Sequence, residues 1–525
     1  MNIKRAKEEI KNTIEAYLLK DELGEYVIPS VRQRPVLLIG PPGVGKTQIM
    51  EQIARECQIG LVAYTITHHT RQSAVGLPFI EKKVYGDREY SVTEYTMSEI
   101  VASVYDRMEE MGLREGILFL DEINCVSETL APAMLQFLQC KTFGTHRLPP
   151  GWILAAAGNP PEYNKSVREF DVVTLDRVKR MDVEPDLSVW KEYAKSQAIH
   201  PAILSYLGIK PDHFCRVETD VDGKRFATPR GWEDLSQFIQ VYERLGKKPD
   251  REVVGQYIQH PGIAKEFANY LEIYYKYQDA YRVEEILKGN FDEALCEKAS
   301  RAPFDEGLGL VGLLLAGLEN GFRSHREHGQ VMELVLEHMK CCRQTLLEGG
   351  GDAGPEAEPW KTVEEQAAEL GALRDKRKKS GLLTRLQDRV YRRAQELLGG
   401  WAGDLRREGQ ENGGLSDTGG KGQQDGAAAW QFLRERFMKE SDRYETEKEE
   451  NGARLEHAFD FMEAAFGSGQ QMVIFVTELN ISQGALAFLN EYECERYFLY
   501  NKELLFDEQE QEIKSRIKKT REGEA

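Results

Sequence analysis

The sequence has few cysteines, and they show no spacing that would bind a metal or cross-link a small fold. Eight cysteines are scattered over 525 residues, and none stands in a C-x-x-C pair. Disulfide frameworks and zinc sites need clustered or regularly spaced cysteines. We therefore expect reduced thiols, and neither a disulfide-rich module nor a zinc site.

Long hydrophobic runs are also missing. The longest strongly apolar run, residues 307–318, is shorter than the about 20 residues that cross a bilayer. The first ten residues (MNIKRAKEEI) are charged and lack the apolar centre of a secretion signal. The sequence therefore predicts no membrane insertion, no export and a cytoplasmic location.

A surplus of positive charge is lacking too. Lysine and arginine number 69 against 87 aspartate and glutamate residues, for a formal net charge of −18. Proteins that coat nucleic acid present a basic face to the phosphates, so we expect no nucleic-acid partner. With 41% hydrophobic residues, the chain has enough apolar surface to bury sizeable cores.

Apolar runs alternate with helical stretches from about residue 35 to residue 185. This alternation is typical of a parallel sheet covered on both faces. The five runs are Val36–Ile39, Gly60–Ile66, Ile117–Leu120, Ile153–Ala157 and Met181–Val183. Later in the chain, glycine-rich stretches interrupt helical patterns, and the run MVIFV at residues 472–476 predicts a buried strand.

These changes of pattern predict the division of the chain. We expect an N-terminal helix (1–30), an α/β domain (31–186), a helical domain (187–290), a helical region (291–398), a flexible Gly-rich linker (399–428) and a C-terminal helix and strand region (429–525).

The most specific motif follows the first apolar run and opens a predicted helix. It reads Gly40-Pro41-Pro42-Gly43-Val44-Gly45-Lys46-Thr47, which is the G-x-x-x-x-G-K-[ST] pattern of a phosphate-binding loop. Glycines let backbone N–H groups surround phosphate oxygens, and the helix N-terminus adds its positive end. The lysine then reaches the β- and γ-phosphates, and Thr47 places a hydroxyl on Mg²⁺. We expect ATP and Mg²⁺ to bind here.

An acidic pair ends the third apolar run. Asp121 and Glu122 follow ILFL, at the edge of a parallel sheet that faces the ligand. Asp121 suits Mg²⁺, and Glu122 suits alignment and deprotonation of the attacking water. The next run ends at Gly158-Asn159-Pro160, where the Asn159 amide could orient that water or contact the γ-phosphate.

In this order, GPPGVGKT, LFLDEIN and AAAGNP resemble the motifs of AAA+ ATPases, and more narrowly of the MoxR/CbbQ-like, helix-2-insert branch. Residues 70–100 read as a short helix and a hairpin around Gly86-Asp87, like the insertion that marks this branch. The resemblance covers about residues 30–290. It implies an α/β P-loop NTPase core of the AAA+ type with a parallel sheet, then an α-helical lid and a mostly helical C-terminal region.

Two further segments match the family. Thr174-Leu175-Asp176-Arg177 resembles the segment whose arginine reaches the neighbouring subunit's nucleotide, and Ala227-Thr228-Pro229-Arg230 resembles the sensor that opens a lid helix. The chain departs from the family where Val178-Lys179-Arg180 lacks the usual phenylalanine. Arg177 or Arg180 therefore remains open as the trans finger, and Arg177 is preferred.

The resemblance implies a ring, most often a hexamer, that hydrolyses ATP to remodel or activate a protein client. In this branch the client often carries a von Willebrand factor A domain. A nucleotide-switched interaction scaffold and a DNA-acting AAA+ motor are the alternatives.

Two other groups of residues draw attention. The adjacent histidines His68 and His69 point to opposite faces of an extended chain, which disfavours a shared metal. The basic run at 374–379, continued by Arg385 and Arg389, predicts a solvated or acid-binding helix rather than a nucleic-acid site, because stacking aromatics are scarce.

Overall fold

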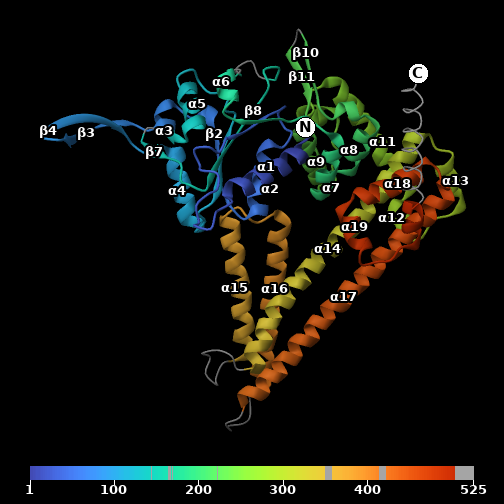
Figure 1. Cartoon of the computed structure of the whole chain (residues 1–525). Helices are drawn as coiled ribbons and strands as arrows, with labels where there is room; N and C mark the ends of the chain where they lie inside the picture. The colour runs from blue at the N-terminus through green and yellow to red at the C-terminus, as the bar shows by residue number, and fades with distance from the viewer. Residues whose placement is uncertain are drawn as a thin grey trace, which may run out of the picture.

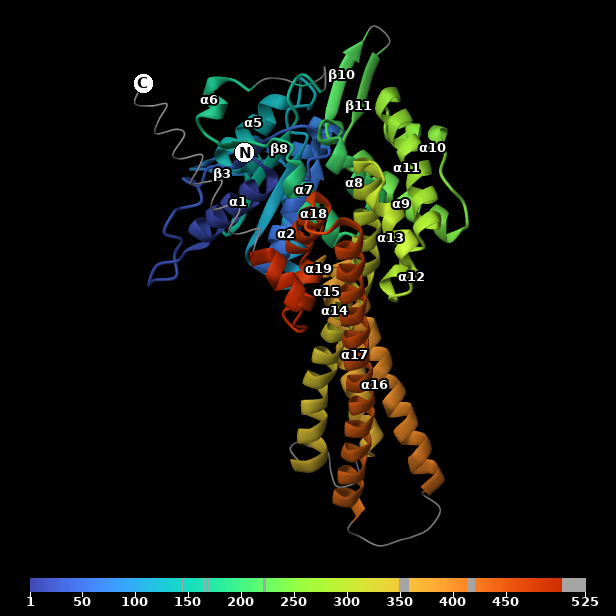
Figure 2. The same cartoon turned by 90° about the vertical axis from the view of Figure 1, so that its right-hand side faces the viewer.

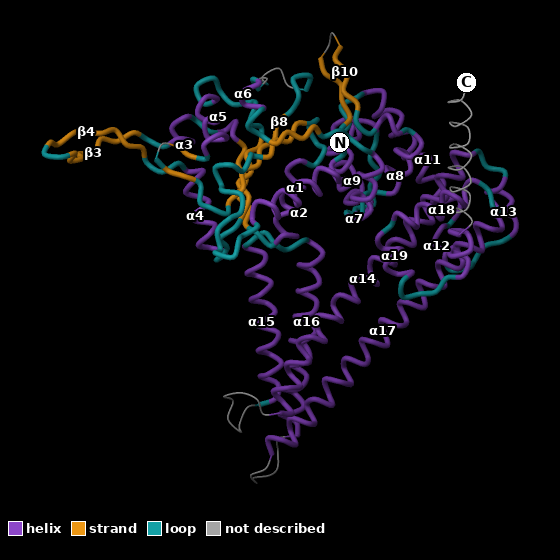
Figure 3. The backbone as a smooth tube through the Cα atoms, in the orientation of Figure 1, coloured by secondary structure: helices purple, strands orange, loops and turns teal. Residues whose placement is uncertain are grey.

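In this computed structural model, an α/β body, a helical lid and a long helical arm follow one another along the chain (Figure 1). The structure describes residues 1–143, 145–163, 167, 170–220, 223–348, 358–412 and 421–502. Strands are confined to the body and to projecting hairpins, and helices make up most of the remainder (Figure 3).

The body is built on a five-stranded sheet in the order β2-β5-β8-β1-β9, and every pairing is parallel. Its strands are β1 (Val36–Ile39), β2 (Gly60–Thr65), β5 (Gly116–Asp121), β8 (Trp152–Gly158) and β9 (Lys179–Asp182). The five predicted runs are therefore the five strands of this sheet. Because parallel strands are covered on both faces, they read as continuous apolar stretches rather than as alternating ones.

Successive residues of β5 point into two separate cores. Ile117 and Phe119 pack with α1 (Ile3–Leu18) and α2 (Lys46–Cys57). Leu118 and Leu120 pack on the other face, against α3 (Arg71–Val75), α4 (Glu99–Met111) and α5 (Ala131–Cys140). This layered packing fixes the carboxyl edge of the sheet, where the predicted site residues stand.

Smaller elements decorate the body. The hairpin of β3 (Pro78–Tyr85) and β4 (Arg88–Tyr95) turns at Gly86 and projects far from the sheet, as the sequence predicted (Figure 1). The others are β6 (Thr142–Phe143), β7 (His146–Arg147), α6 (Val172–Leu175) and the 3-10 turn η1 (Ile66–His68). The first 30 residues form one helix only to Leu18 and continue as a loop.

The lid begins at α7 and is mainly helical. It comprises α7 (Leu187–Ser196), α8 (Pro201–Ile209), η2 (Pro211–His213), α9 (Pro229–Arg244), α10 (Arg251–Tyr257), α11 (Pro261–Tyr281), α12 (Val283–Leu287) and α13 (Glu293–Ser300). A hairpin of β10 (Arg216–Asp220) and β11 (Gly223–Ala227) interrupts the helices. Sequence periodicity had not indicated these two strands, because their alternation spans only five residues each.

Four long helices form the arm. They are α14 (Phe304–Glu348), α15 (Pro359–Lys379), α16 (Arg385–Asn412) and α17 (Lys421–Phe466). At 1.5 Å per residue, α14 alone is about 67 Å long. Helix α15 lies beside α16, and the two diverge from α14 and α17 toward the body (Figure 1 and Figure 2). The four helices share a core that includes Val335, Leu370, Leu398 and Leu433.

Two predictions for the C-terminal half are wrong in part. Residues 472–476 belong to α18 (Gln470–Ile481) and not to a strand, because Met472, Phe475, Val476 and Leu479 form one buried helical face. The predicted linker at 399–428 is helical at both ends, in α16 and α17, since Trp401 and Ala402 pack into the arm core. Residues 413–420 of that linker lie outside the described residues.

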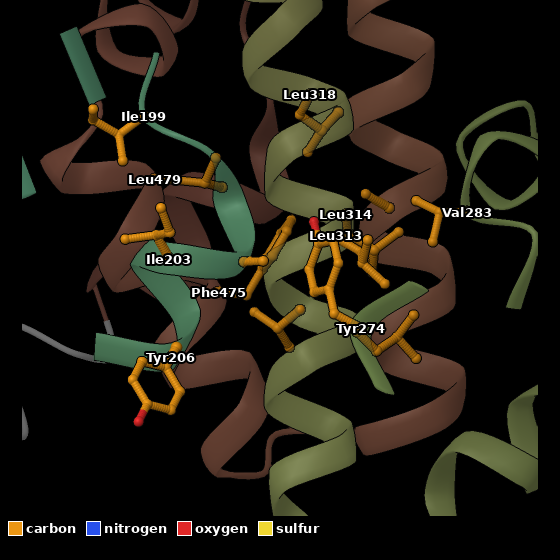
Figure 4. Packing of buried hydrophobic residues seen from close by; sticks show 14 of the residues in the cluster. Ile199, Ile203, Tyr206, Tyr274, Val283, Leu313, Leu314, Leu318, Phe475 and Leu479 are labelled. Carbon is orange, nitrogen blue, oxygen red and sulfur yellow. The ribbon is translucent and has the colours of Figure 1, made fainter. Parts of the chain in front are cut away.

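The lid and the base of the arm share one hydrophobic core. Ile203 of α8, Leu314 of α14 and Phe475 of α18 belong to it (Figure 4). The helix α19 (Gln483–Leu489) adds Phe488 to the same core. Within the described ranges, no single helix has both the length and the apolar character of a membrane span, and only α18 and α19, bent by 86°, meet both criteria as a pair.

Candidate nucleotide site

The loop between β1 and α2 has the backbone that phosphate binding needs. Gly43 and Gly45 have φ angles of 80° and 92°, in the left-handed region that side chains rarely adopt. Gly45 is also the residue that caps α2, so the loop leads directly into the helix N-terminus. Backbone N–H groups and the positive end of the helix dipole are therefore available to an anion at this place.

Lys46 is buried at the end of the phosphate loop, with 8% of its surface exposed. Its Nζ donates hydrogen bonds to the carbonyl oxygens of Gly40 (2.7 Å) and Pro41 (2.8 Å), and to Asn159 Oδ1 (3.0 Å). Burial lowers the pKa of Lys46 to about 8, although the Asp121 carboxylate opposes this shift. An incoming phosphate would supply the negative charge that these neutral partners lack.

Thr47 and Asp121 meet at the end of β5. Thr47 Oγ1 donates to Asp121 Oδ2 at 2.7 Å, and the Glu122 backbone N–H donates to Asp121 Oδ1 at 2.9 Å. A hydroxyl and a carboxylate oxygen side by side are hard ligands, and Mg²⁺ is usually held by one or two such groups together with waters and substrate phosphates. The donor set therefore fits a magnesium ion bound together with a nucleotide.

Glu122 stands in an uncommon backbone conformation, with φ at 56°. Left-handed backbone in a residue other than glycine is costly and is often found at functional sites. Its side chain accepts a hydrogen bond from Thr67 Oγ1 at 2.9 Å, from the segment after β2. The turn thus separates two adjacent carboxylates: Asp121 points to Thr47 and Glu122 points to Thr67.

Asn159 is held by a neighbouring asparagine. Asn124 Nδ2 donates to the Asn159 carbonyl at 2.8 Å, and the Asn159 N–H donates to Asn124 Oδ1 at 3.3 Å. A Cβ at Gly158 would lie 2.5 Å from Asn124 Oδ1, so this approach requires glycine at position 158. The Asn159 side chain is left to contact Lys46, at the position where a γ-phosphate would be expected.

The lid approaches the phosphate loop through Arg230. Thr228 caps α9 by accepting a hydrogen bond from the Gly231 N–H, and Pro229 occupies the first turn. A Cβ at Gly43 would lie 3.1 Å from the Cβ of Arg230, so the lid helix and the loop are in close contact. Arg230 is thereby positioned beside the loop although it lies more than 180 residues further along the chain.

These groups line one cavity of about 120 Å³ at the carboxyl edge of the sheet. The predicted residues on its wall are Pro42, Gly43, Gly45, Lys46, Thr47, Asp121, Glu122, Asn159 and Arg230. Gln48 and Glu233 also line it, and the sequence analysis did not select them. The remaining loop residues Gly40, Pro41 and Val44 lie behind this wall, and Gly40 and Pro41 take part through their carbonyl contacts with Lys46.

The two finger candidates lie outside this cavity. Arg177 is exposed after α6, where its Nη1 donates to Gln139 Oε1. Arg180 lies on β9 and pairs with Asp182 at 2.8 Å. Neither arginine contacts the nucleotide site of its own chain, which is the placement that a finger acting on a neighbouring subunit requires.

The structure also places the other sequence candidates. His69 lies edge-on to Tyr64, and the described residues hold no group of three or more His, Cys, Asp or Glu side chains that could bind a metal. In the basic run, Arg374 pairs with Asp388 at 2.8 Å and Arg389 pairs with Glu327 at 2.9 Å. Part of that charge is therefore neutralised within the arm.

Comparison with known proteins relates the N-terminal part of the chain to a known family. Residues 36–173 match the family described as "ATPase family associated with various cellular activities (AAA)". ATPase family gene 2 protein homolog B from Mus musculus is 30% identical over 143 residues, which cover 26% of this chain and 16% of that protein. The Rattus norvegicus homologue is 35% identical over 94 residues, covering 18% and 10%. The chain thus spans less than a fifth of either relative.

Among solved structures, a Thermotoga maritima RuvB mutant overlaps 57% of this chain and 75% of its own, with 15% sequence identity and a TM-score of 0.27. An overlap at that score carries no argument about this chain. The family match covers the phosphate loop and four of the five strands of the parallel sheet. The N-terminal part of this chain is an AAA ATPase domain with a P-loop AAA+ core, followed by a mostly helical C-terminal region.

Proposed function

We propose that this chain is a MoxR-like AAA+ ATPase that hydrolyses ATP, with Mg²⁺, to remodel or activate a protein client. The observation that carries the hydrolytic part is the cavity at the sheet edge, where the phosphate loop, the acidic pair, Asn159 and Arg230 converge. Groups from three strand ends and from the lid helix meet there. Such convergence is what phosphoryl transfer needs, because its catalysis is mainly positioning and charge stabilisation.

In this proposal each residue has a defined task. The loop amides and Lys46 bind the β- and γ-phosphates. Thr47 and Asp121 hold Mg²⁺, which when bound supplies positive charge to the phosphoryl oxygens. Glu122 leaves Thr67 to align the attacking water and accept its proton, while Asn159 orients the water or the γ-phosphate.

The arginines complete the site from outside the sheet. Arg230 brings charge from the lid, so closure of the lid and nucleotide binding are linked. Arg177 is exposed and free to reach the nucleotide of an adjacent subunit in a ring, which we propose to be a hexamer. In other NTPases such an arginine is worth about 10³–10⁵ in rate.

The projecting hairpin of β3 and β4 and the order of motifs support the helix-2-insert branch. On that resemblance we propose a client with a von Willebrand factor A domain and a cytoplasmic site of action. The long arm favours a second candidate, a nucleotide-switched scaffold, because it is a large helical extension (Figure 2) that contributes no residue to the lining of the nucleotide cavity.

The substitution Glu122→Gln separates the two candidates. It keeps the size and hydrogen-bonding capacity of the side chain but cannot accept the proton, so we expect ATP to bind and hydrolysis to fall at least about 100-fold. Steady-state phosphate release and ATP retention after gel filtration measure the two effects. The matched control is Glu109→Gln, an exposed carboxylate on α4 away from the cavity, which should leave turnover unchanged.

A remodeller with Glu122→Gln loses its biological activity while it traps ATP and client. A scaffold keeps its biological activity under the same change, and that outcome would reject ATP-driven remodelling. The DNA-motor alternative is tested by filter binding at low and moderate salt, where an absence of salt-sensitive retention rejects it.

A further inference from the structure

A second and much larger cavity lies where the lid meets the base of the arm. Its volume is about 1100 Å³, and α8, α9 and α11 of the lid and α14 and α18 of the arm base contribute its walls. Ile199, Tyr274, Leu313 and Leu479, which line it, belong to the core shown in Figure 4. A ligand pocket is commonly found at such a junction between domains.

Polar groups converge on one wall of this cavity. His200 is 5% exposed, and its Nδ1 accepts a hydrogen bond from the Ala202 N–H at 3.2 Å. Its Nε2 therefore carries the proton and donates to Glu243 Oε1 at 2.9 Å, and Tyr275 donates to the same oxygen at 2.9 Å. Burial raises the pKa of Glu243, but the hydrogen bonds from His200 and Tyr275 outweigh it and hold this carboxylate ionised. The negative charge of Glu243 is thus already stabilised by His200 and Tyr275.

On the cavity wall, most acidic side chains have a partner within the protein, whereas most basic side chains form no ion pair within the described ranges. Six carboxylates line it, and five of them have partners: Glu243 with His200, Glu284 with Arg454, Glu285 with Lys288, Glu319 with Ser482, and Glu478 with Lys195. Five lining cations form no ion pair with any residue that the structure describes: Arg244, Lys247, Lys248, Arg282 and Arg323. The lining as a whole holds seven lysine and arginine side chains against six carboxylates, so it is close to neutral in a protein with a net charge of −18, and its cations without such an ion pair are the groups open to a ligand.

The same cavity is also lined by aromatic and apolar side chains. The Lys248 ammonium lies 4.9 Å from the centre of the Tyr275 ring. Arg282, between α11 and α12, has a left-handed backbone with φ at 46°. Arg244 lies in the last turn of α9, where a basic residue stabilises the helix. That role accounts for an arginine at this position, but it does not account for the large cavity beside it.

We propose that this cavity binds a small organic anion that carries at least two phosphate or carboxylate groups. Its negative groups pair with the unpaired cations at the margin, above all Lys247, Lys248 and Arg282. Its carbon skeleton lies against Tyr274, Tyr275 and the apolar wall. The site is separate from the nucleotide site, with which it shares no lining residue, and its existence does not depend on the proposed ATP hydrolysis.

The test uses the full chain with Lys46→Ala, so that the phosphate loop cannot bind the probe. Titration calorimetry without Mg²⁺ measures binding of inorganic pyrophosphate, the phosphate probe, and of citrate, the carboxylate probe. We expect saturable binding of at least one probe with one site per chain. The double substitution Lys247→Gln and Lys248→Gln should weaken that binding at least about tenfold, since two charge-assisted contacts are lost.

The matched control is Lys376→Gln with Lys379→Gln, which removes the same charge from the exposed end of α15 and should leave the affinity unchanged. Hydrogen exchange with the bound probe should slow in residues 243–248 and 278–285. The proposal is overturned if neither probe saturates, if both double variants weaken binding equally, or if protection appears elsewhere. Circular dichroism and the melting temperature show that the variants are folded, and Arg282→Gln repeats the test at a second position.

Discussion

Lys46 is the residue whose surroundings change most when a triphosphate arrives. Burial lowers its pKa to about 8 in the nucleotide-free protein. Phosphate oxygens beside Nζ favour the charged form and raise that pKa. ATP binding should therefore take up about half a proton at pH 8, and less as the pH falls and Lys46 becomes charged beforehand.

Calorimetry in buffers with different ionisation enthalpies measures this uptake directly. Lys46→Arg is the control, because a guanidinium is charged at every working pH and binds nucleotide without proton uptake if it binds at all. A buffer-independent binding enthalpy in the unsubstituted protein at pH 8 would contradict the placement of Lys46 in a desolvated loop.

A second buried lysine affects stability rather than binding. Lys141 is 6% exposed, and burial lowers its pKa to about 8. Because the unfolded chain keeps the ordinary value near 10.5, it binds more protons than the folded chain above pH 8. The contribution of Lys141 to the free energy of unfolding should therefore rise with pH from about 8 to about 9.5. Buried cysteines such as Cys342 and Cys494, whose pKa burial raises, contribute the opposite dependence in this range.

The substitution Lys141→Met removes the contribution of Lys141 to the pH dependence of the unfolding free energy, whereas Lys46, whose pKa burial also lowers to about 8, keeps its own. It removes a desolvated charge but leaves Gln33 Oε1 without its contact at 3.4 Å, so we expect a net gain of about 1–2 kcal/mol in unfolding free energy at pH 7. Urea unfolding at several pH values measures it, with the exposed Lys379→Met as the control. If Lys141→Met has the same pH slope as the unsubstituted protein, Lys141 is not the group responsible.

At this scale the sequence pointed to residues that the structure brings together in one cavity, for a chemical reason. A phosphate loop needs particular residue types at fixed spacing, so Lys46, Thr47 and Asp121 could be recognised from the motif alone. Thr67 and Glu233 were missed because any of several polar residues could stand there, and only the approach of distant segments gives them a place beside Glu122 and the phosphate loop.

At the scale of elements, the lid and the arm base are joined by a charged contact. Lys195 of α7 pairs with Glu478 of α18 at 2.5 Å and also donates to the Glu478 carbonyl at 2.8 Å. Burial raises the pKa of Glu478, but Lys195 and Lys191 outweigh it and lower the pKa below its usual value. The contact therefore stabilises the fold at neutral pH and weakens as the pH falls through the folded-state pKa.

Glu478→Gln should lower the unfolding free energy by about 2–4 kcal/mol, because it leaves two partly buried ammonium groups without a counter-charge. The double substitution Lys195→Met with Glu478→Leu should cost less than the single change. Denaturant unfolding of Lys195→Met, Glu478→Leu and the double variant gives the coupling energy. Purely additive effects would show that α7 and α18 are not coupled through this pair.

The elements themselves were predicted unevenly. The five sheet strands were found because short apolar runs of three to seven residues, separated by helices, fit a buried parallel sheet. The run at 472–476 fits a strand equally well by composition, and only its tertiary partners show that the helical face of α18 is the buried one. The glycine-rich stretch after residue 399 was misjudged because Trp401 and Ala402 pack into the arm core although glycines flank them.

At the scale of the whole molecule, one core joins the lid to the base of the arm. The lid helices, α14, α17 and α18 contribute to it, whereas the body has its own cores on the two faces of the sheet. A movement of the lid on nucleotide binding therefore carries the arm with it. No sequence pattern indicated this, because the contacts join segments that are distant in the sequence, such as Lys195 and Glu478, which are 283 positions apart.

The association of subunits gives the last prediction. Arg177 lies outside the nucleotide cavity of its own chain, so the proposed ring places it in the cavity of a neighbour. Chains with Arg177→Ala should bind ATP but hydrolyse it poorly, and chains with Glu122→Gln should be inactive for the reason given above. In an equal mixture, a site with an intact Glu122 regains the finger from a Glu122→Gln neighbour. Random assembly should restore about a quarter of the activity, because half of the sites keep Glu122 and half of those gain Arg177.

Phosphate release at protein concentrations that favour assembly measures the restored rate, and the same mixture made with Arg180→Ala tests the other candidate. Arg180 pairs with Asp182 in its own chain, so its replacement should leave activity close to that of the unsubstituted protein and give nothing to restore. Full activity of Arg177→Ala on its own, or a silent mixture in which both variants demonstrably assemble together, would show that hydrolysis does not use this arginine across a subunit boundary.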